Sequence, residues 1–326
     1  MIDLHVHLPG SIRVETLLEL AIEQDAYLPA YDLQTLQNEM HVPKDCTYLR
    51  DVVERYRLIE TVLQDRKSIK RVTYELVRQL DKQGVLYAEI RLSPQFHTLR
   101  GLSQSMVVDA AVAGLKRGIE DSKNIRANLL LCTIRGADEK DNFETIVEAE
   151  HYLGKGVAGI DLDGSEAQFS TSLYEEQIRL IRMEEIPFTM HAGISAGADS
   201  IREALRLGVK RIGHCVRARE DEGIIEELEK RGILLEMCPT ANLKNHAVKD
   251  IWDFPIMDYY NRGIKVCANS DNLLIYDTNV VKEYNLLQRT FGITKEQIYQ
   301  MNLNALEGAF ISRYEKMEIK QLLDTM

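Results

Sequence analysis

The feature that most restricts the fold of this chain is a regular alternation of apolar, β-rich runs with helical segments. The β-rich runs are residues 2–8, Val85–Leu92, Ala127–Ile134, Val157–Leu162, Pro187–His191, Arg211–His214, Ile233–Cys238 and Ile264–Ala268. Helical spacing of apolar residues separates the later runs, at 103–121, 141–154, 172–184, 198–207, 219–231 and, in a weaker pattern, 247–261. Strands that alternate with helices pair in parallel. Eight such repeats within 326 residues predict an α/β fold, a closed (β/α)8 TIM barrel.

Extra helices are expected at two places. The segment from 13 to 83, after the first strand, is mostly helical in pattern, and helices are also expected at 278–290, 294–301 and 303–316, before a polar tail. The first of these segments either forms a lid over a site or fills space beside the barrel. No linker interrupts the pattern, so residues 1–326 are expected to form a single domain.

Composition excludes several classes of partner. The net charge is −11 with no basic run, which argues against nucleic acid or an anionic membrane surface as the partner. The apolar runs are strand length and too short to span a bilayer, and no secretion signal is expected. Five cysteines without a Cys-x-x-Cys motif favour a reduced, cytoplasmic location. The expected partner is a small molecule, and no feature specifies an oligomeric state.

Polar residues mark the ends of four of the predicted strands. In a (β/α)8 barrel the active site lies at the carboxyl ends of the strands, so these side chains are expected to converge. The residues are His5, His7, His191, His214 and Asp271. The other histidines, His41, His97, His151 and His246, lie in predicted helices or loops and are expected at the surface.

Three imidazoles and a carboxylate are a donor set that suits zinc or a similar divalent ion. Such an ion lowers the pKa of a bound water to ~7 and so generates a hydroxide nucleophile. His214 is then the natural residue to orient or deprotonate that water. Binuclear barrels of this kind resemble one another in bridging their metals with a carboxylated lysine on the fourth strand. Here Lys155 precedes that strand, so one ion is expected.

Six motifs occur in a fixed order: Leu4-His-Val-His-Leu8, Ile160-Asp-Leu-x-Gly164-x-Glu166, His191-Ala-Gly193, Arg211-Ile-Gly-His214, Glu236-Met-Cys-Pro-Thr240 and Asn269-Ser-Asp271. In this order they resemble the adenosine deaminase family of the amidohydrolase superfamily along essentially the whole chain. The resemblance implies that His5, His7, His191 and Asp271 bind zinc and that His214 positions the attacking hydroxide. It implies that the Gly164 N–H donates to a purine ring nitrogen. The implied reaction, in purine metabolism, is attack of metal-bound hydroxide on an amino-bearing ring carbon with release of ammonia.

Three positions depart from the family pattern. The family motif His-Ala-Gly-Glu ends in a glutamate that protonates the ring, and Ile194 stands there instead. Loss of a general acid costs ~10²–10⁴-fold in rate, so adenosine is expected to be a poor substrate. Asn272 replaces the second aspartate of Ser-Asp-Asp and can still donate a hydrogen bond to a ring nitrogen. Pro9 replaces an aspartate implicated in holding the ribose, which suggests a different or absent sugar.

Two residues lie where they could replace the missing acid. Glu166 follows the fourth strand and Cys215 follows His214. A loop-capping carboxylate and a small thiol in the barrel wall are the alternative interpretations. Glu236 occupies a position where the family also carries glutamate and is therefore no new acid.

Three functional hypotheses follow. The first is a mononuclear zinc hydrolase that deaminates a purine-like or related heterocycle other than adenosine. The second is a catalytically silent homologue that binds metal and purine, favoured by Ile194 but not by the presence of His214. The third, a phosphoesterase opening with His-x-His, would need more metal ligands at the strand ends.

Overall fold

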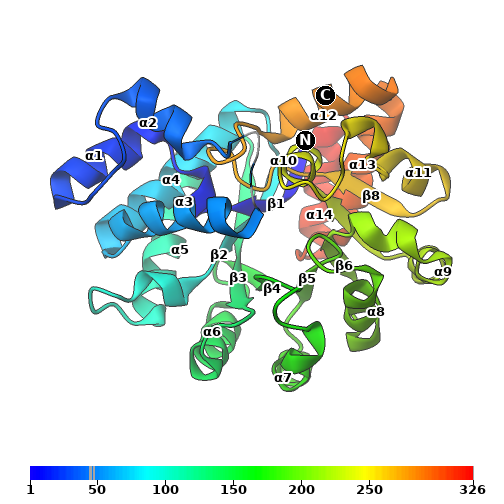
Figure 1. Ribbon diagram of the computed structural model, residues 1–326, viewed down its shortest axis with the longest axis horizontal. Helices are drawn as coiled ribbons and strands as arrows, with labels where there is room; N and C mark the ends of the chain where they lie inside the picture. Colours follow the sequence, from blue (N-terminus) through cyan, green and yellow to red (C-terminus); the bar gives the residue numbers. More distant parts are fainter. Residues whose placement is uncertain (44–45, 47, 326) are drawn as a thin grey trace.

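The computed structural model describes residues 1–43, 46 and 48–325. Eight parallel strands form one sheet in sequence order from β1 to β8, which confirms the predicted (β/α)8 architecture. The strands are β1 (Ile2–His7), β2 (Tyr87–Leu92), β3 (Arg126–Ile134), β4 (Val157–Asp163), β5 (Phe188–Ala192), β6 (Arg211–His214), β7 (Leu234–Met237) and β8 (Lys265–Ala268). Figure 1 shows the strands at the centre of the molecule with helices around them.

Both faces of β1 are buried because one face points into the barrel and the other towards the helices. The apolar residues Ile2, Leu4 and Val6 are fully buried, as are the alternating polar residues Asp3 and His5. The barrel closes at Asp271, just after β8. The Asp271 N–H donates to the His5 carbonyl at 2.7 Å, and the His7 N–H donates to the Asp271 carbonyl at 2.8 Å. The β1–β8 seam therefore passes through three of the predicted metal ligands.

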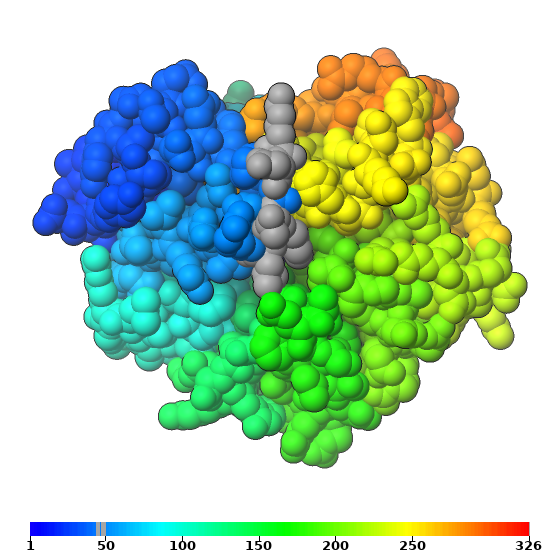
Figure 2. All heavy atoms as spheres, viewed as in Figure 1, coloured from blue at the N-terminus to red at the C-terminus, as the bar shows by residue number. Residues whose placement is uncertain are grey.

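The helices lie outside the barrel. They are α1 (Val14–Gln24), α2 (Leu33–Met40), α3 (Tyr48–Val62), α4 (Arg66–Lys82), α5 (Gln104–Glu120), α6 (Glu139–Tyr152), α7 (Glu175–Met183), α8 (Ala198–Leu207), α9 (Glu222–Arg231), α10 (Pro239–Lys244), α11 (Ile256–Asn261), α12 (Val280–Phe291), α13 (Lys295–Gly308) and α14 (Arg313–Leu323). The extra helices α1–α4 follow β1, as predicted. In Figure 2 the first helices, in blue, form one side of the visible surface, beside the yellow segment that follows β7. No described helix is both long and apolar enough to cross a bilayer.

The prediction for the last 30 residues was wrong in two details. The expected break near 302 is absent, since α13 runs unbroken to Gly308. Asn302 is buried within it and accepts the Ile2 N–H at 2.7 Å, which satisfies the start of β1. The expected polar tail is helix α14, which begins with a capping box between Ser312 and Glu315 and buries Ile319 against the barrel.

Candidate active site

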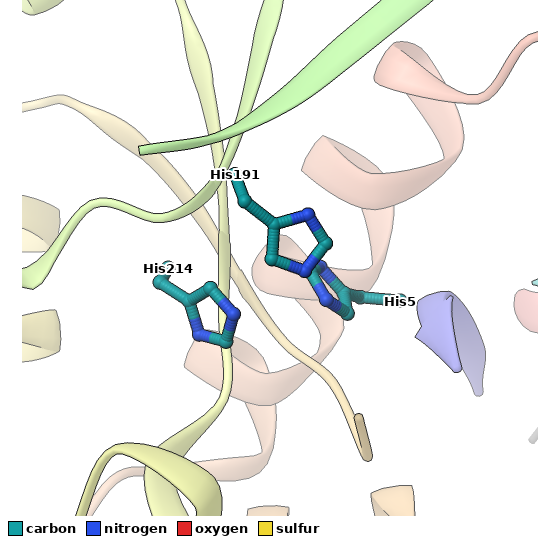
Figure 3. A group of neighbouring side chains, drawn as sticks. All are labelled: His5, His191 and His214. Carbon is teal, nitrogen blue, oxygen red and sulfur yellow. The ribbon is translucent and has the colours of Figure 1, made fainter. Parts of the chain in front are cut away.

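The strand ends bring the predicted histidines together. The ring centroids of His5 and His191 are 4.6 Å apart, and that of His214 lies 4.9 Å from His5 and 5.0 Å from His191. Figure 3 shows these three imidazoles facing one another. The fourth, His7, has its Nε2 atom 3.3 Å from His5 Nε2. Asp271 joins the group, with Oδ1 3.7 Å from His7 Nε2. The structure thus places the five predicted metal-site and catalytic residues in one cluster.

The backbone of this cluster is unusual. His214 and Asp271 have φ angles of 65° and 64°, in the left-handed region that residues other than glycine rarely adopt. Such conformations occur at functional sites, where the surrounding structure holds them in place. A Cβ atom at Gly213 would lie 2.9 Å from His5 Cε1, so glycine is needed there for the His5 ring to fit.

Polar groups behind the histidines fix the orientation of three rings. His5 Nδ1 donates to Glu236 Oε2 at 3.0 Å, and His191 Nδ1 lies 2.8 Å from Asp161 Oδ2. His214 Nδ1 lies 3.1 Å from the side-chain amide nitrogen of Asn242. With each Nδ1 atom engaged in this way, the Nε2 atoms are left for the interior of the cluster. This arrangement is typical of metal-binding histidines.

Two buried arginines connect these carboxylates. Arg91 Nε donates to Asp161 Oδ2 at 2.7 Å, and Arg91 Nη2 donates to Glu236 Oε2 at 2.5 Å. Arg211 Nε donates to the other oxygen of Glu236 at 2.7 Å and forms an ion pair with Glu89 at 2.6 Å. The side chains of all these residues are at most 1% exposed. A layer of paired charges therefore lies directly beneath the histidines.

The cluster fits a divalent metal ion. Zinc–nitrogen bonds of ~2.0–2.1 Å in tetrahedral geometry place neighbouring donors ~3.3–3.4 Å apart. The two Nε2 atoms of His5 and His7 have a spacing of 3.3 Å. Burial lowers the pKa of His5 and His214 and takes that of His7 to about 3, so these imidazoles keep free lone pairs. Burial also raises the pKa of Asp271 to about 7, a cost that a neighbouring cation would remove.

A cavity of about 430 Å³ opens in front of this cluster. Helix α3 covers one side of it, through Val52, Val53, Tyr56, Arg57 and Glu60. The wall also includes Ser93, Phe96, His97, Ile134, Arg135, Asp163, Gly164, Ser165, Gln168, Phe169 and Tyr276, together with Pro9, Arg91 and Asn272. A volume of this size and several apolar and aromatic walls are typical of small-molecule sites. Within the segment after β1, helix α3 therefore covers the site, which is one of the two roles expected of that segment.

Two of the three residues expected to touch the substrate line this cavity. The Gly164 N–H is already used, since it donates to Asp163 Oδ1 at 2.6 Å. The Asn272 side chain donates to Asp271 and accepts from the Tyr56 hydroxyl. The third, Ile194, is buried, and in the described part of the chain it is not one of the residues that form the cavity wall.

Glu166 forms the loop that follows β5. Its carboxylate accepts the backbone N–H groups of Gly193, Ile194 and Ser195 at 2.8, 2.6 and 2.7 Å, and also the Ser200 hydroxyl. This is the loop-capping role, and it leaves no free oxygen to act as an acid. Burial raises the pKa of Cys215, which also makes this thiol a poor proton donor. Neither residue replaces the missing glutamate.

Sequence reasoning missed four residues of the cavity wall. Asp163 lies two residues after Asp161, on the same face of β4, so the two-residue period could have identified it. Tyr56 and Glu60 share a face of α3, four residues apart, and burial raises the pKa of Glu60 to about 7. His97 was expected at the surface, and that prediction was wrong. It lies in a 3₁₀ turn (Pro94–His97) directly after β2 and is only 1% exposed.

The buried His97 is expected to make the protein less stable as the pH falls. Burial lowers its pKa to about 4, whereas in the unfolded chain it is about 6.5. Between these values the unfolded state binds a proton that the folded state does not. The free energy of unfolding therefore decreases as the pH is lowered from about 6.5 to about 4, by ~3 kcal/mol in all. Urea unfolding of the wild type and of His97→Gln between pH 7.5 and 4 measures the difference. Equal pH slopes in the two proteins would contradict the prediction, and His151→Gln, at the surface, is the control.

Comparison with protein families gives one match that spans the chain. The family model described as "Adenosine deaminase" matches residues 1–326. An adenosine deaminase from Haemophilus ducreyi is 37% identical over 320 residues, covering 97% of this chain and 93% of the relative. An adenosine deaminase from Enterococcus faecalis is 36% identical over 324 residues, covering 99% and 95%.

Solved structures with the same fold include two deaminases and a protein in complex with IMP. The adenine deaminase of Arthrobacter aurescens has a TM-score of 0.90 and 25% identity, covering 99% of this chain and 98% of its own. The N6-mAMP deaminase of Arabidopsis has a TM-score of 0.90 and 26% identity, covering 100% and 97%. A complex of ADAL with IMP has a TM-score of 0.89 and 25% identity, covering 99% and 96%.

Proposed function

The chain belongs to the adenosine deaminase family and is a hydrolase of the deaminase type, and on that premise we propose that it uses one zinc ion to deaminate a purine-like or related heterocycle other than adenosine. The observation that carries the proposal is the convergence of His5, His7, His191, His214 and Asp271 at the base of one cavity. A donor set with three imidazoles and one carboxylate supports zinc among the divalent ions.

The reaction exchanges a ring C–N bond for a C–O bond. Water adds to the amino-bearing carbon, and the amino nitrogen leaves as ammonia. A zinc ion held by His5, His7, His191 and Asp271 would supply the Lewis acidity that makes water nucleophilic near neutral pH. His214 Nε2, on the cavity side of its ring, takes the proton from the attacking water and returns it to the departing amine when the Asn242 side-chain oxygen, which has no other partner among the described residues, accepts the Nδ1–H of His214.

The side chains of the cavity wall bind and orient the heterocycle. Phe96 and Phe169, 37% and 36% exposed, offer aromatic faces on which a heterocycle can stack. Asn272 and Gly164 line the cavity, and we assign them to the edge of the ring, to which Asn272 can donate the second of its two side-chain N–H groups. Ile194 offers no proton, which is why the proposal excludes adenosine as an efficient substrate. The buried, free thiols of Cys132, Cys215, Cys238 and Cys267 support the proposed cytoplasmic location.

The test is ammonia release by zinc-loaded protein from adenosine, deoxyadenosine, adenine, N6-substituted adenines and amino-pterins. The proposal expects turnover of at least one of these compounds and, for adenosine, a rate ~10²–10⁴-fold below that of an enzyme with the general acid. Metal analysis of the same samples should give one zinc per chain. Bound zinc and ligand without ammonia from any compound would instead favour the silent binding protein.

A further inference from the structure

Several hydrogen-bond donors around the metal ligands are already engaged within the protein. The Gly164 N–H donates to Asp163, one of the two Asn272 side-chain N–H groups to Asp271, and the Tyr56 hydroxyl to Asn272. Arg91 reaches the cavity wall, but its three nitrogens donate to Asp161, the Leu4 carbonyl and Glu236. The N–H and O–H groups used in these contacts are not free to donate to a ring nitrogen.

Acceptors, in contrast, remain available. Asp163 Oδ2 lies 3.7 Å from His7 Nδ1, beyond hydrogen-bond distance, and its side chain is 26% exposed on the cavity wall. His97 donates from Nδ1 to the Leu63 carbonyl at 3.0 Å, so its Nε2 atom is an acceptor, and this buried atom has no partner among the described residues. The Glu60 carboxyl, one helical turn from Tyr56 on α3, adds a third acceptor.

An unpaired acceptor in a partly buried cavity favours ligands that carry donors. A hydrogen bond from a neutral donor to a carboxylate is stronger than one between neutral groups, whereas a ring nitrogen lone pair facing a carboxylate is repelled. Asp163 is the acceptor nearest to the metal ligands, with Oδ1 3.7 Å from His191 Nε2. Its partner on a bound ligand would therefore belong to the reacting ring.

We propose that Asp163 is a specificity-determining residue, which selects heterocycles whose ring edge carries an N–H donor, either a second exocyclic amine or a ring N–H, beside the amino group that leaves. The inference rests on the proposed function only in taking this cavity as the substrate site. The substrate class is a polyamino or lactam-type aminoheterocycle, not a ring that presents only acceptors.

Binding measured without turnover tests the inference. Isothermal titration of the zinc-loaded protein compares purine with 2-aminopurine, and adenine with 2,6-diaminopurine, pairs that differ by one exocyclic amine. In each pair, the compound with the additional exocyclic amine (2-aminopurine or 2,6-diaminopurine) is expected to bind at least ~10-fold more tightly, which is the contribution of one hydrogen bond to a charged group. Equal binding within both pairs would overturn the inference, and this comparison needs no variant.

The Asp163→Asn variant keeps the shape of the side chain and turns an amide N–H towards the cavity. The preference for the amine-bearing ligands is expected to fall at least ~10-fold, while Ser165→Ala, in the same stretch of wall, retains it. An unchanged preference in Asp163→Asn overturns the inference. Zinc content is measured in both variants, because His7, Asp163 and His191 could themselves hold an ion. Loss of zinc from Asp163→Asn would make Asp163 a metal ligand and would also overturn it.

The two proposals can fail separately. Preferential binding of the amine-bearing ligands without ammonia from any compound would refute the deaminase and leave the specificity of Asp163 intact. Ammonia from adenosine or adenine, with no preference for a second donor, would support the deaminase and refute the role of Asp163.

Discussion

Replacement of His214 by alanine is expected to lower kcat by ~10²–10⁴-fold, the contribution typical of a positioned acid–base group. The ring is 1% exposed, its Nδ1 atom is held by Asn242, and its Nε2 atom lies 3.9 Å from Asp271 Oδ2. Burial lowers the pKa of His214, so the imidazole is neutral before the reaction. The measurement is kcat and KM on the best substrate of the ammonia panel, with zinc content determined in parallel.

Two controls separate proton transfer from a general disturbance of the site. Asn242→Ala removes the side chain that orients the His214 ring and leaves the ring itself in place. This variant is expected to lower kcat by at least ~10-fold, the smallest effect typical of the loss of an orienting partner. His151→Ala, on an exposed part of α6, should leave kcat unchanged. If His214→Ala kept its zinc and more than a tenth of wild-type kcat, another group would be the base.

Replacement of Glu236 by glutamine is expected to lower the free energy of unfolding by ~3–5 kcal/mol, because it breaks a buried ion pair and leaves its partners uncompensated. Glu236 accepts from Arg91, Arg211 and His5, and also from Thr189 Oγ1 at 3.1 Å. Glutamine has the same shape but no charge, so two guanidinium groups lose a buried counter-ion. Urea unfolding of the metal-free protein at pH 7.5 measures the change without the contribution of zinc.

The matched control is an ion pair on the surface. Glu175 pairs with Arg206 at 3.1 Å, with both side chains about half exposed, and Glu175→Gln should leave the unfolding curve unchanged within error. Similar stabilities for Glu236→Gln and the wild type would mean that the buried layer is energetically neutral. It would then serve only to orient His5 and His191.

The sequence predicted well the positions of residues that follow from strand and helix periodicity. The two-residue alternation of β1 and the strand–helix repeat located all five residues of the histidine–aspartate cluster, because in a parallel barrel every strand ends at the same rim. Periodicity failed where a polar residue has a tertiary role. Asn302 interrupts the apolar pattern of α13 but is used to pair with β1, and the polar C-terminal segment is helical because its cap and Ile319 make it so.

The residues behind and in front of the cluster were harder to predict. Which carboxylate reaches which histidine depends on the register between strands: Glu236 on β7 meets His5 on β1, and Asp161 on β4 meets His191 on β5. The engagement of the Gly164 N–H by Asp163 depends on one side-chain rotamer. His97 was misplaced because a short turn after β2, invisible to helix or strand periodicity, directs it inwards.

The seam at Asp271 also governs the order in which the molecule can be assembled. His5 and Asp271 are joined by a backbone hydrogen bond across 266 positions of the chain, so closing the barrel carries the entropy cost of a very long loop. During synthesis, β1 emerges first and keeps an unpaired edge until the segment after β8 is made. Contacts of such long range form late and slow the folding of a domain. The proposed metal site is therefore completed by the same final step that removes the exposed edge, so an ion bound there would be taken up late in the maturation of the chain.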